Sequence, residues 1–218
     1  MSRRGRHGRR RTRDLEQRGV VDVGDAPREP RRRSQADRRP SVGPATAGPT
    51  VVSLTLRPVE EGGPWPLTRV LTALSAFDVE RIGVARALGD RHGVPLIHSQ
   101  QLRWGEVNVL IEARHGRDGV DELSVELPPW DDVLKAAGDE RAWGFLDTVA
   151  AAADARFGSI GDGEPPETEA ADGPAVLERQ LRRHLALLLP EWTAEDADAV
   201  GATIRRQLPR SGLMVVTS

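Results

Sequence analysis

The sequence contains no cysteine and no tyrosine, and its only lysine is Lys135. Without cysteine the chain cannot form a disulfide, a thiolate metal site or a thiol nucleophile. No apolar run approaches the ~20 residues that a membrane-spanning helix requires. The basic N-terminus is not followed by the apolar segment of a secretory signal. These absences favour a cytoplasmic protein, and the sequence predicts no metal and no cofactor.

Arginine is abundant although lysine is scarce, and glycine (22) and proline (16) are also frequent. We interpret this bias as that of a GC-rich bacterial genome.

The charge is unevenly distributed along the chain. Residues 1–50 carry 14 arginines and six acidic residues, a net charge of +8, whereas residues 51–218 carry 17 basic and 27 acidic residues, a net charge of −10. Two parts of such different charge are expected to serve different partners.

Residues 1–50 have almost no large apolar side chains and no helical or strand period, which predicts a disordered arm. Its clustered arginines could hold nucleic acid phosphates through charge. No aromatic residue is present to stack on bases, so such binding would not depend on base sequence. Two other interpretations remain open, a solvated tail and a start codon assigned upstream of a true start near Val51. The arginines that would contact nucleic acid are Arg9, Arg10, Arg11, Arg31, Arg32 and Arg33.

The stretch 104–130 predicts an antiparallel hairpin with one buried face. Apolar and polar residues alternate on both sides of a turn at 115–119, and this period of two is typical of half-buried strands. The two glycines of the turn can adopt the positive φ that a loop of this length needs. A lone hairpin is marginally stable in water, so further strands or a covering helix are required. The residues expected on the buried face are Val107, Val109, Ile111, Ala113, Leu123, Val125 and Leu127.

The segments that flank the hairpin can supply these further elements. Apolar alternation predicts strands at 51–57, 81–88 and 94–99, and an amphipathic stripe predicts a helix over 66–77. Two prolines then end the hairpin, because proline cannot donate to a strand ladder, and a short helix is expected after them.

The clearest helical period covers residues 142–157, with Gly158 positioned to end the helix in the left-handed conformation. Four consecutive alanines in this helix allow a close approach to the apolar face of the hairpin. A glycine-rich turn is expected at 158–163. The acidic segment 164–173 is predicted to be a mobile linker.

Beyond the linker the apolar period predicts helices at 174–189 and 194–207, and β-branched residues predict a last strand at 213–217. The fold class is therefore predicted to be α+β: a mainly antiparallel sheet of about four to six strands, packed on one side by amphipathic helices. We assign residues 51–218 to a single domain of this kind, preceded by the disordered arginine-rich arm.

No complete catalytic motif is present. The nucleophile elbow G-x-S-x-G is absent, and the glycines at 158–163 lack the preceding strand and following helix of a dinucleotide loop. His98 is the best candidate for an acid–base group, with a carboxylate from Glu106 or Glu112 on the polar face of the hairpin. A purely structural histidine explains the same residue.

Trp104 and Trp130 flank the hairpin, where they could pair across strands, fill the core or contribute to a binding surface, since tryptophan is enriched in binding hot spots. An acidic folded part without a catalytic motif predicts a non-catalytic module that binds a protein partner. In the order of its elements, the chain resembles small bacterial immunity proteins that neutralise toxins. Two alternatives remain, a small hydrolase-type enzyme with a dispersed site near His98 and a nucleic-acid-associated protein that uses the arginine-rich arm.

Overall fold

A computed structural model describes the chain in six segments, and these residues form part of one compact unit, Gly43–Ser218. Residues 1–47 of the predicted arm, with the six arginines named as nucleic-acid contacts, the turn at 116–119 and the linker at 164–173 lie outside the described residues, whereas Thr50, at the predicted end of the arm, begins a strand. Among the helices of the described segments, none is long and apolar enough to cross a bilayer. The described segments are 48–58, 64–89, 97–115, 121–163, 174–190 and 194–218.

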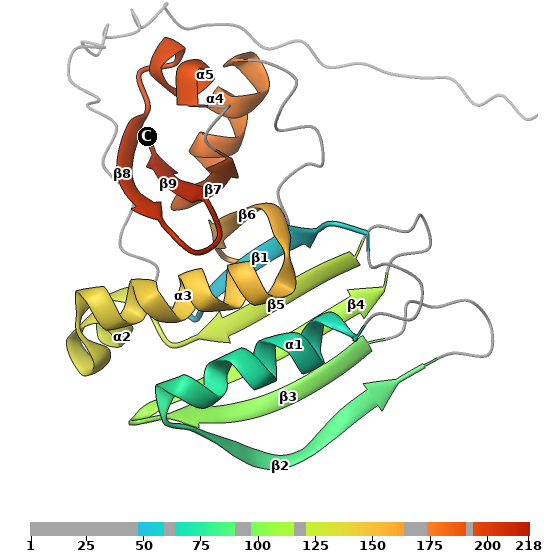
Figure 1. Cartoon of the computed structure of the whole chain (residues 1–218). Coiled ribbons are helices and arrows are strands. Elements are labelled where there is room, and N and C mark those ends of the chain that lie inside the picture. The colour runs from blue at the N-terminus through green and yellow to red at the C-terminus, as the bar shows by residue number, and fades with distance from the viewer. Residues whose placement is uncertain (1–47, 59–63, 90–96, 116–120, 164–173, 191–193) are drawn as a thin grey trace, which may run out of the picture. The chain divides into compact units, whose positions relative to one another are not determined.

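One sheet of nine strands organises the fold, in the order β2-β3-β4-β5-β1-β6-β7-β9-β8 (Figure 1). Every neighbouring pair is antiparallel. The predicted α+β class is confirmed, but the predicted number of strands was too small. The strands are β1 (Thr50–Leu56), β2 (Val79–Leu88), β3 (Ile97–Trp104), β4 (Val107–His115), β5 (Asp121–Leu127), β6 (Ala155–Gly161), β7 (Ala186–Pro190), β8 (Thr203–Leu208) and β9 (Leu213–Thr217).

Five α-helices and one short 3-10 helix accompany the sheet in the described segments. The helix predicted at 66–77 is split into an α-helical and a 3-10 part, and the short helix after the two prolines is confirmed. The helices are α1 (Pro66–Ala73), η1 (Leu74–Phe77), α2 (Trp130–Ala137), α3 (Asp139–Ala153), α4 (Pro174–Arg183) and α5 (Ala194–Ala199).

The predicted hairpin is present as β4 and β5, in a register that pairs Ile111 with Val125 and Ala113 with Leu123. Directly opposed residues of an antiparallel pair share a face, so the apolar set of both strands points the same way. All seven residues predicted on the buried face are buried. The alternating pattern therefore identified both the strands and their inward side.

Helices α1, α2 and α3 cover that inward side, and α1 and α3 run across it next to each other (Figure 1). The ring of Phe145 on α3 stacks on Trp104 of β3, with centroids 4.6 Å apart and planes 14° from parallel. Phe77 packs edge-on against both rings. The alanine-rich helix thus packs on the sheet as predicted, but its contact with β3 is made by aromatic rings.

A second core lies on the opposite side of the sheet, at its C-terminal half. Leu187 and Leu189 of β7 join the apolar residues of α4 and α5 there, whereas Leu188 between them belongs to the first core. Successive side chains of a strand point to opposite faces, so helices cover both faces of this half. The prediction that helices pack on one side only was wrong.

The segment 155–161 is a central strand, β6, although the sequence predicted the end of a helix and a glycine-rich turn. Helix α3 ends at Ala153 because Asp154 adopts the left-handed conformation, with φ 58° and ψ 51°, which a short polar side chain tolerates. Gly158 lies in the strand between β1 and β7. A Cβ there would lie 2.6 Å from the Ser53 carbonyl oxygen, so this glycine permits close strand packing instead of ending a helix.

Two further helix predictions were too long. The predicted helix at 174–189 ends at Arg183 and continues as β7, and the one at 194–207 ends at Ala199 and is followed by β8. The run Leu187–Leu189 is buried on both faces of the sheet, so it shows no alternation, and a short continuous apolar run is equally compatible with helix and strand. The predicted last strand is confirmed as β9.

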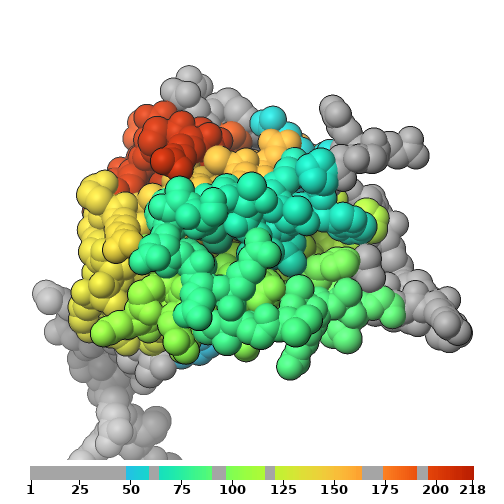
Figure 2. All heavy atoms as spheres, turned by 60° about the horizontal axis from the view of Figure 1, so that its bottom comes forward, coloured from blue at the N-terminus to red at the C-terminus, as the bar shows by residue number. Residues whose placement is uncertain are grey.

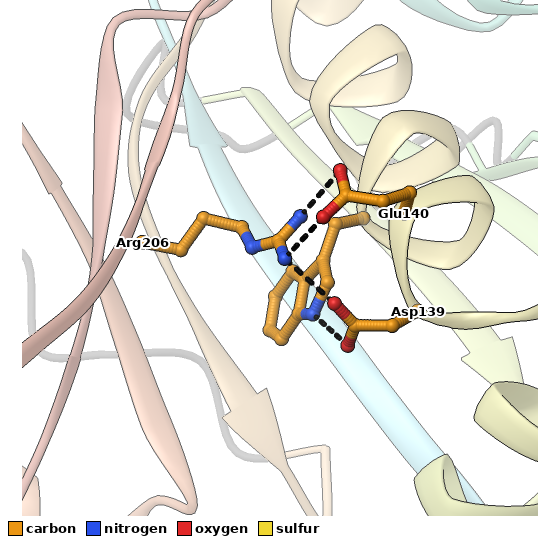
Figure 3. A network of polar contacts seen from close by, with 4 residues as sticks. Asp139, Glu140 and Arg206 are labelled. Carbon is orange, nitrogen blue, oxygen red and sulfur yellow. Dashed lines mark hydrogen bonds and ion pairs between the residues drawn. The ribbon is translucent and has the colours of Figure 1, made fainter.

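Polar contacts join the β8–β9 hairpin to α3. Arg206 donates to Glu140 at 2.8 and 3.0 Å and to Asp139 at 2.6 Å (Figure 3). The bonded guanidinium holds the pKa of the Glu140 carboxyl below its ordinary value. About two turns further along α3, the buried Asp147 accepts bonds from Arg210 N, Ser211 N and Ser211 Oγ at 3.0, 2.9 and 2.8 Å. These contacts fix the far edge of the sheet against the helix that covers its centre.

Candidate functional site

The face of β1–β5 that points away from α1–α3 is not covered by any helix of the described segments, because α4 and α5 pack on β7 and β9 instead. The outward residues of β4 and β5 are exposed or partly exposed, in contrast to their buried neighbours, whereas the outward Ser53 and Thr55 of β1 are buried. We call this surface the open face. It contains residues Ser53, Ser99, Gln101, Arg103, Asn108, Leu110, Glu112, Arg114, Glu122, Ser124 and Glu126, as the strand registers require.

Three hollows of about 230, 700 and 460 Å³ indent the open face, and Leu110 lines all of them. The largest extends toward Pro129 at one end of β5, and the third reaches the edge strand β2. At that edge Val84 is 88% and Leu88 64% exposed, and Figure 2 shows the green side chains of β2 at the surface beside α1. Ligand sites are typically concave, which makes this face the leading candidate.

The smallest hollow, of about 230 Å³, is lined by three glutamates and one arginine. We call it the glutamate pocket. Arg114 lies 3.5 Å from Glu112 and is ion-paired with it. Glu122 and Glu126 make no ion pair with any described residue. The pocket therefore has an excess of negative charge, and its other polar walls are Ser53 and Ser124.

The structure does not bring His98 together with either predicted carboxylate. His98 is opposite Ala113 and its neighbour Ser99 is opposite Glu112, so His98 and Glu112 point to opposite faces of the sheet. Glu106 lies in the turn between β3 and β4, next to Trp104. His98 and Trp104 are six strand residues apart, roughly 20 Å at about 3.3 Å per residue, and Glu106 lies two residues beyond Trp104. The predicted pairing is wrong for both residues.

His98 instead lies at the opposite end of β3, on the helix side of the sheet, where its ring neighbour is Trp65. Its ring lies 5.1 Å from that of Trp65, which in turn lies 6.1 Å from the ring of His115. His115 Nδ1 contacts the buried carboxylate of Asp121, which is its register partner on β5. His98 Nε2 is buried and has no hydrogen-bond partner within the described segments. Trp65, His98, His115 and Asp121 form what we call the histidine cluster.

The histidine cluster was missed because its members are far apart in sequence. The alternation of β4 continues to His115 and that of β5 begins at Asp121, so the pairing of these two residues follows from the hairpin register alone. Nothing in the local sequence indicates that Trp65, at the start of α1, lies between the two imidazoles. No group of three metal-ligating side chains occurs in the described part of the chain.

The two tryptophans considered as binding residues are separated in the structure. Trp104 is only 3% exposed and lies under Phe145 in the core. Trp130 begins α2 and packs edge-on against Trp143 at 4.9 Å, and its backbone N–H donates to Thr50 Oγ1 at 2.9 Å. Trp104 therefore fills the core, which is the simplest of the interpretations considered for this residue.

The chain matches no protein-family model, no curated protein and no solved structure.

Proposed function

We propose that this protein is a non-catalytic module that binds a protein partner through the open face. The observation that supports it is the asymmetry of this part of the sheet: the inward side chains of β1, β3, β4 and β5 are buried under three helices, and the other side is hollowed and uncovered by described helices. Five strands ~4.8 Å apart and about seven residues long give a flat footprint on the order of 500 Å². Side chains that project from the strands add to this area, which brings it close to the ≈800 Å² that each partner contributes to a standard interface.

A photoreactive benzoylphenylalanine at Asn108 should cross-link the protein partner in the native host. Asn108 is exposed on β4 and lines the largest hollow, so a docked partner would lie within reach of the reactive ketone. The measurement is gel electrophoresis after irradiation, followed by mass spectrometry of the shifted band and reconstitution of the pair from purified proteins.

The matched control carries the same photoreactive residue at Ala136, which is exposed on α2 and lies on the helix side. A discrete adduct at Asn108 that is absent at Ala136 supports the proposal. Equal labelling at both positions, or no adduct at Asn108, would show that the open face is not the binding surface.

A second candidate function, acid–base catalysis, is favoured by the pairing of His115 with Asp121. A buried carboxylate on Nδ1 holds an imidazole in one tautomer and orientation, which leaves Nε2 to act as a base. The side chain of His115 is about half exposed, so Nε2 is accessible from solvent. This pair replaces His98 with Glu106 or Glu112 as the basis of the hydrolase hypothesis.

If the histidine cluster is catalytic, His115→Asn should reduce the hydrolysis of an activated ester such as p-nitrophenyl acetate by about 10²-fold or more, the usual contribution of a positioned general base. Glu112→Gln, on the other face of the sheet, should leave the rate unchanged. The rates are measured by absorbance of released nitrophenolate, with circular dichroism to verify folding. A wild-type rate no greater than that of free imidazole would exclude this candidate.

A further inference from the structure

Strand β2 forms one edge of the sheet, and no described strand pairs with its outer side (Figure 1). All ten of its residues except Val79 and Ile82 are exposed, and the exposed ones include the large apolar side chains of Val84 and Leu88. An edge strand presents a row of unpaired backbone N–H and C=O groups, which makes it a template for pairing with another strand. A long edge that also exposes apolar side chains therefore indicates an interaction surface.

A bulge interrupts the pairing of β2 with β3. Between Ile82 and Arg86, β2 contains three residues where β3 contains only Gln100. The buried side-chain amide of Gln100 donates to the Ile82 carbonyl oxygen at 3.2 Å and so fills the bulge from the β3 side. Bulges can protect an edge from pairing, but an even number of extra residues leaves the alternation of faces unchanged. The side chains of β2 that point to the open face are therefore Glu80, Ile82, Val84, Arg86 and Leu88.

This row of side chains is self-complementary when two copies of β2 lie antiparallel about a two-fold axis at Gly83. Glu80 of one copy is then opposite Arg86 of the other, and Ile82 is opposite Val84. The symmetry makes each pair occur twice. Opposite charges and apolar side chains that face each other across an antiparallel pair are stabilising. Gly83 has no side chain, which lets the two backbones approach closely at the axis.

The opposite edge of the sheet lacks this complementarity. Its strand β8 contains two basic residues, Arg205 and Arg206, and no acidic residue. Pairing of two copies of β8 would bring like charges together, which is destabilising. Charge therefore favours β2 over β8 as the edge that meets its own copy.

We propose that two copies of this chain associate edge to edge through β2, in an antiparallel pair with its two-fold axis at Gly83. Backbone hydrogen bonds across the new pair hold the two sheets together, and the contacts between Glu80 and Arg86 fix the register. The inference goes beyond the proposed function and does not depend on it, because pairing at the edge leaves the open face of each copy uncovered. Ten strand residues span roughly 33 Å, and a sheet is about 10 Å thick, so each copy buries on the order of 330 Å². That area is well below a standard interface, and the dimer is therefore weak and reversible.

The test is sedimentation equilibrium of the full-length protein at concentrations from about 1 μM to about 1 mM, the range in which a weak complex dissociates. The mass of the wild type is expected to rise from that of one chain toward that of two. Val84→Arg is expected to weaken the dimer at least about tenfold, because it places a charge at the centre of the pair. The matched control is Ile204→Arg, which adds the same charge at an exposed apolar residue of β8. It should change the dissociation constant less than about twofold, since β8 is the other edge.

A charge exchange tests the register. Glu80→Arg and Arg86→Glu each place like charges opposite each other, so each single variant is expected to dimerise more weakly than the wild type. The double variant Glu80→Arg/Arg86→Glu has the net charge of the wild type and again opposes unlike charges, so it should recover most of the affinity. Circular dichroism verifies that each variant is folded, and if Val84→Arg is not, the charge exchange alone decides.

Selective loss in Val84→Arg together with recovery in the double variant supports the inference. A monomer at every concentration would mean that any strand paired with β2 belongs to another protein, and it overturns the inference. The inference also fails if Val84→Arg is as tight as the wild type or no weaker than Ile204→Arg, or if the double variant is no tighter than the single ones. Assembly beyond a dimer contradicts it as well, because a two-fold pair of edges is closed.

Discussion

Replacing Phe145 by alanine is expected to lower the free energy of unfolding by about 3–5 kcal/mol, the usual cost of truncating a fully buried aromatic side chain. Phe145 is 1% exposed and joins α3 to β3 through its stacking on Trp104 and to η1 through Phe77. Its removal leaves a cavity where three elements meet. The measurement is urea unfolding followed by far-ultraviolet circular dichroism, which is independent of the altered environment of Trp104.

Phe145→Leu is the matched control for this prediction. Leucine retains much of the apolar volume but loses the ring stacking, which is worth about 0.5–1.5 kcal/mol beyond area burial. The leucine variant should therefore lie between the wild type and the alanine variant. A midpoint for Phe145→Ala equal to that of the wild type would contradict the central position assigned to this ring.

Replacing Asp147 by alanine should lower the free energy of unfolding by about 3 kcal/mol, because each buried donor left without an acceptor costs about 1–3 kcal/mol. Three donors, Arg210 N, Ser211 N and Ser211 Oγ, lose their acceptor in this variant. The loss falls on the turn between β8 and β9, so hydrogen exchange in 203–217 should accelerate more than exchange in the β4–β5 hairpin. Urea unfolding measures the overall loss and hydrogen exchange its location.

Arg210→Ala tests whether the effect belongs to the carboxylate. This change removes the bond from the Arg210 guanidinium to Thr148 Oγ1 but retains the backbone N–H that donates to Asp147. A loss below about 1 kcal/mol is expected, since the lost bond is near the surface. If Arg210→Ala were as destabilising as Asp147→Ala, the side chain of Arg210 and not the buried carboxylate would hold the hairpin.

The candidate sites show where reasoning from sequence alone fails. His98 was selected as the acid–base candidate, but its pairing with Glu112 assumed that a nearby polar residue lies on the same face. The register of β3 and β4 places the two on opposite faces. The register of β4 and β5 brings His115 to Asp121 and collects Glu112, Glu122 and Ser124 around one pocket. Such groupings depend on which strands are neighbours, and neighbouring strands need not be adjacent in sequence.

The sequence by itself determined the elements whose side chains face two different environments. In β4, β5 and α1, one side of the element is buried and the other is exposed to solvent. The apolar residues of such an element repeat with its structural period, and this period identifies the element from the sequence. Only the tertiary structure decided β6 and β7, since strands enclosed on both sides carry no such period. There, pairing with neighbours on both sides and the close approach at Gly158 outweigh local preference. The uncovered face of β1–β5 also follows from the tertiary structure, because it depends on α4 and α5 packing over β7 and β9 instead.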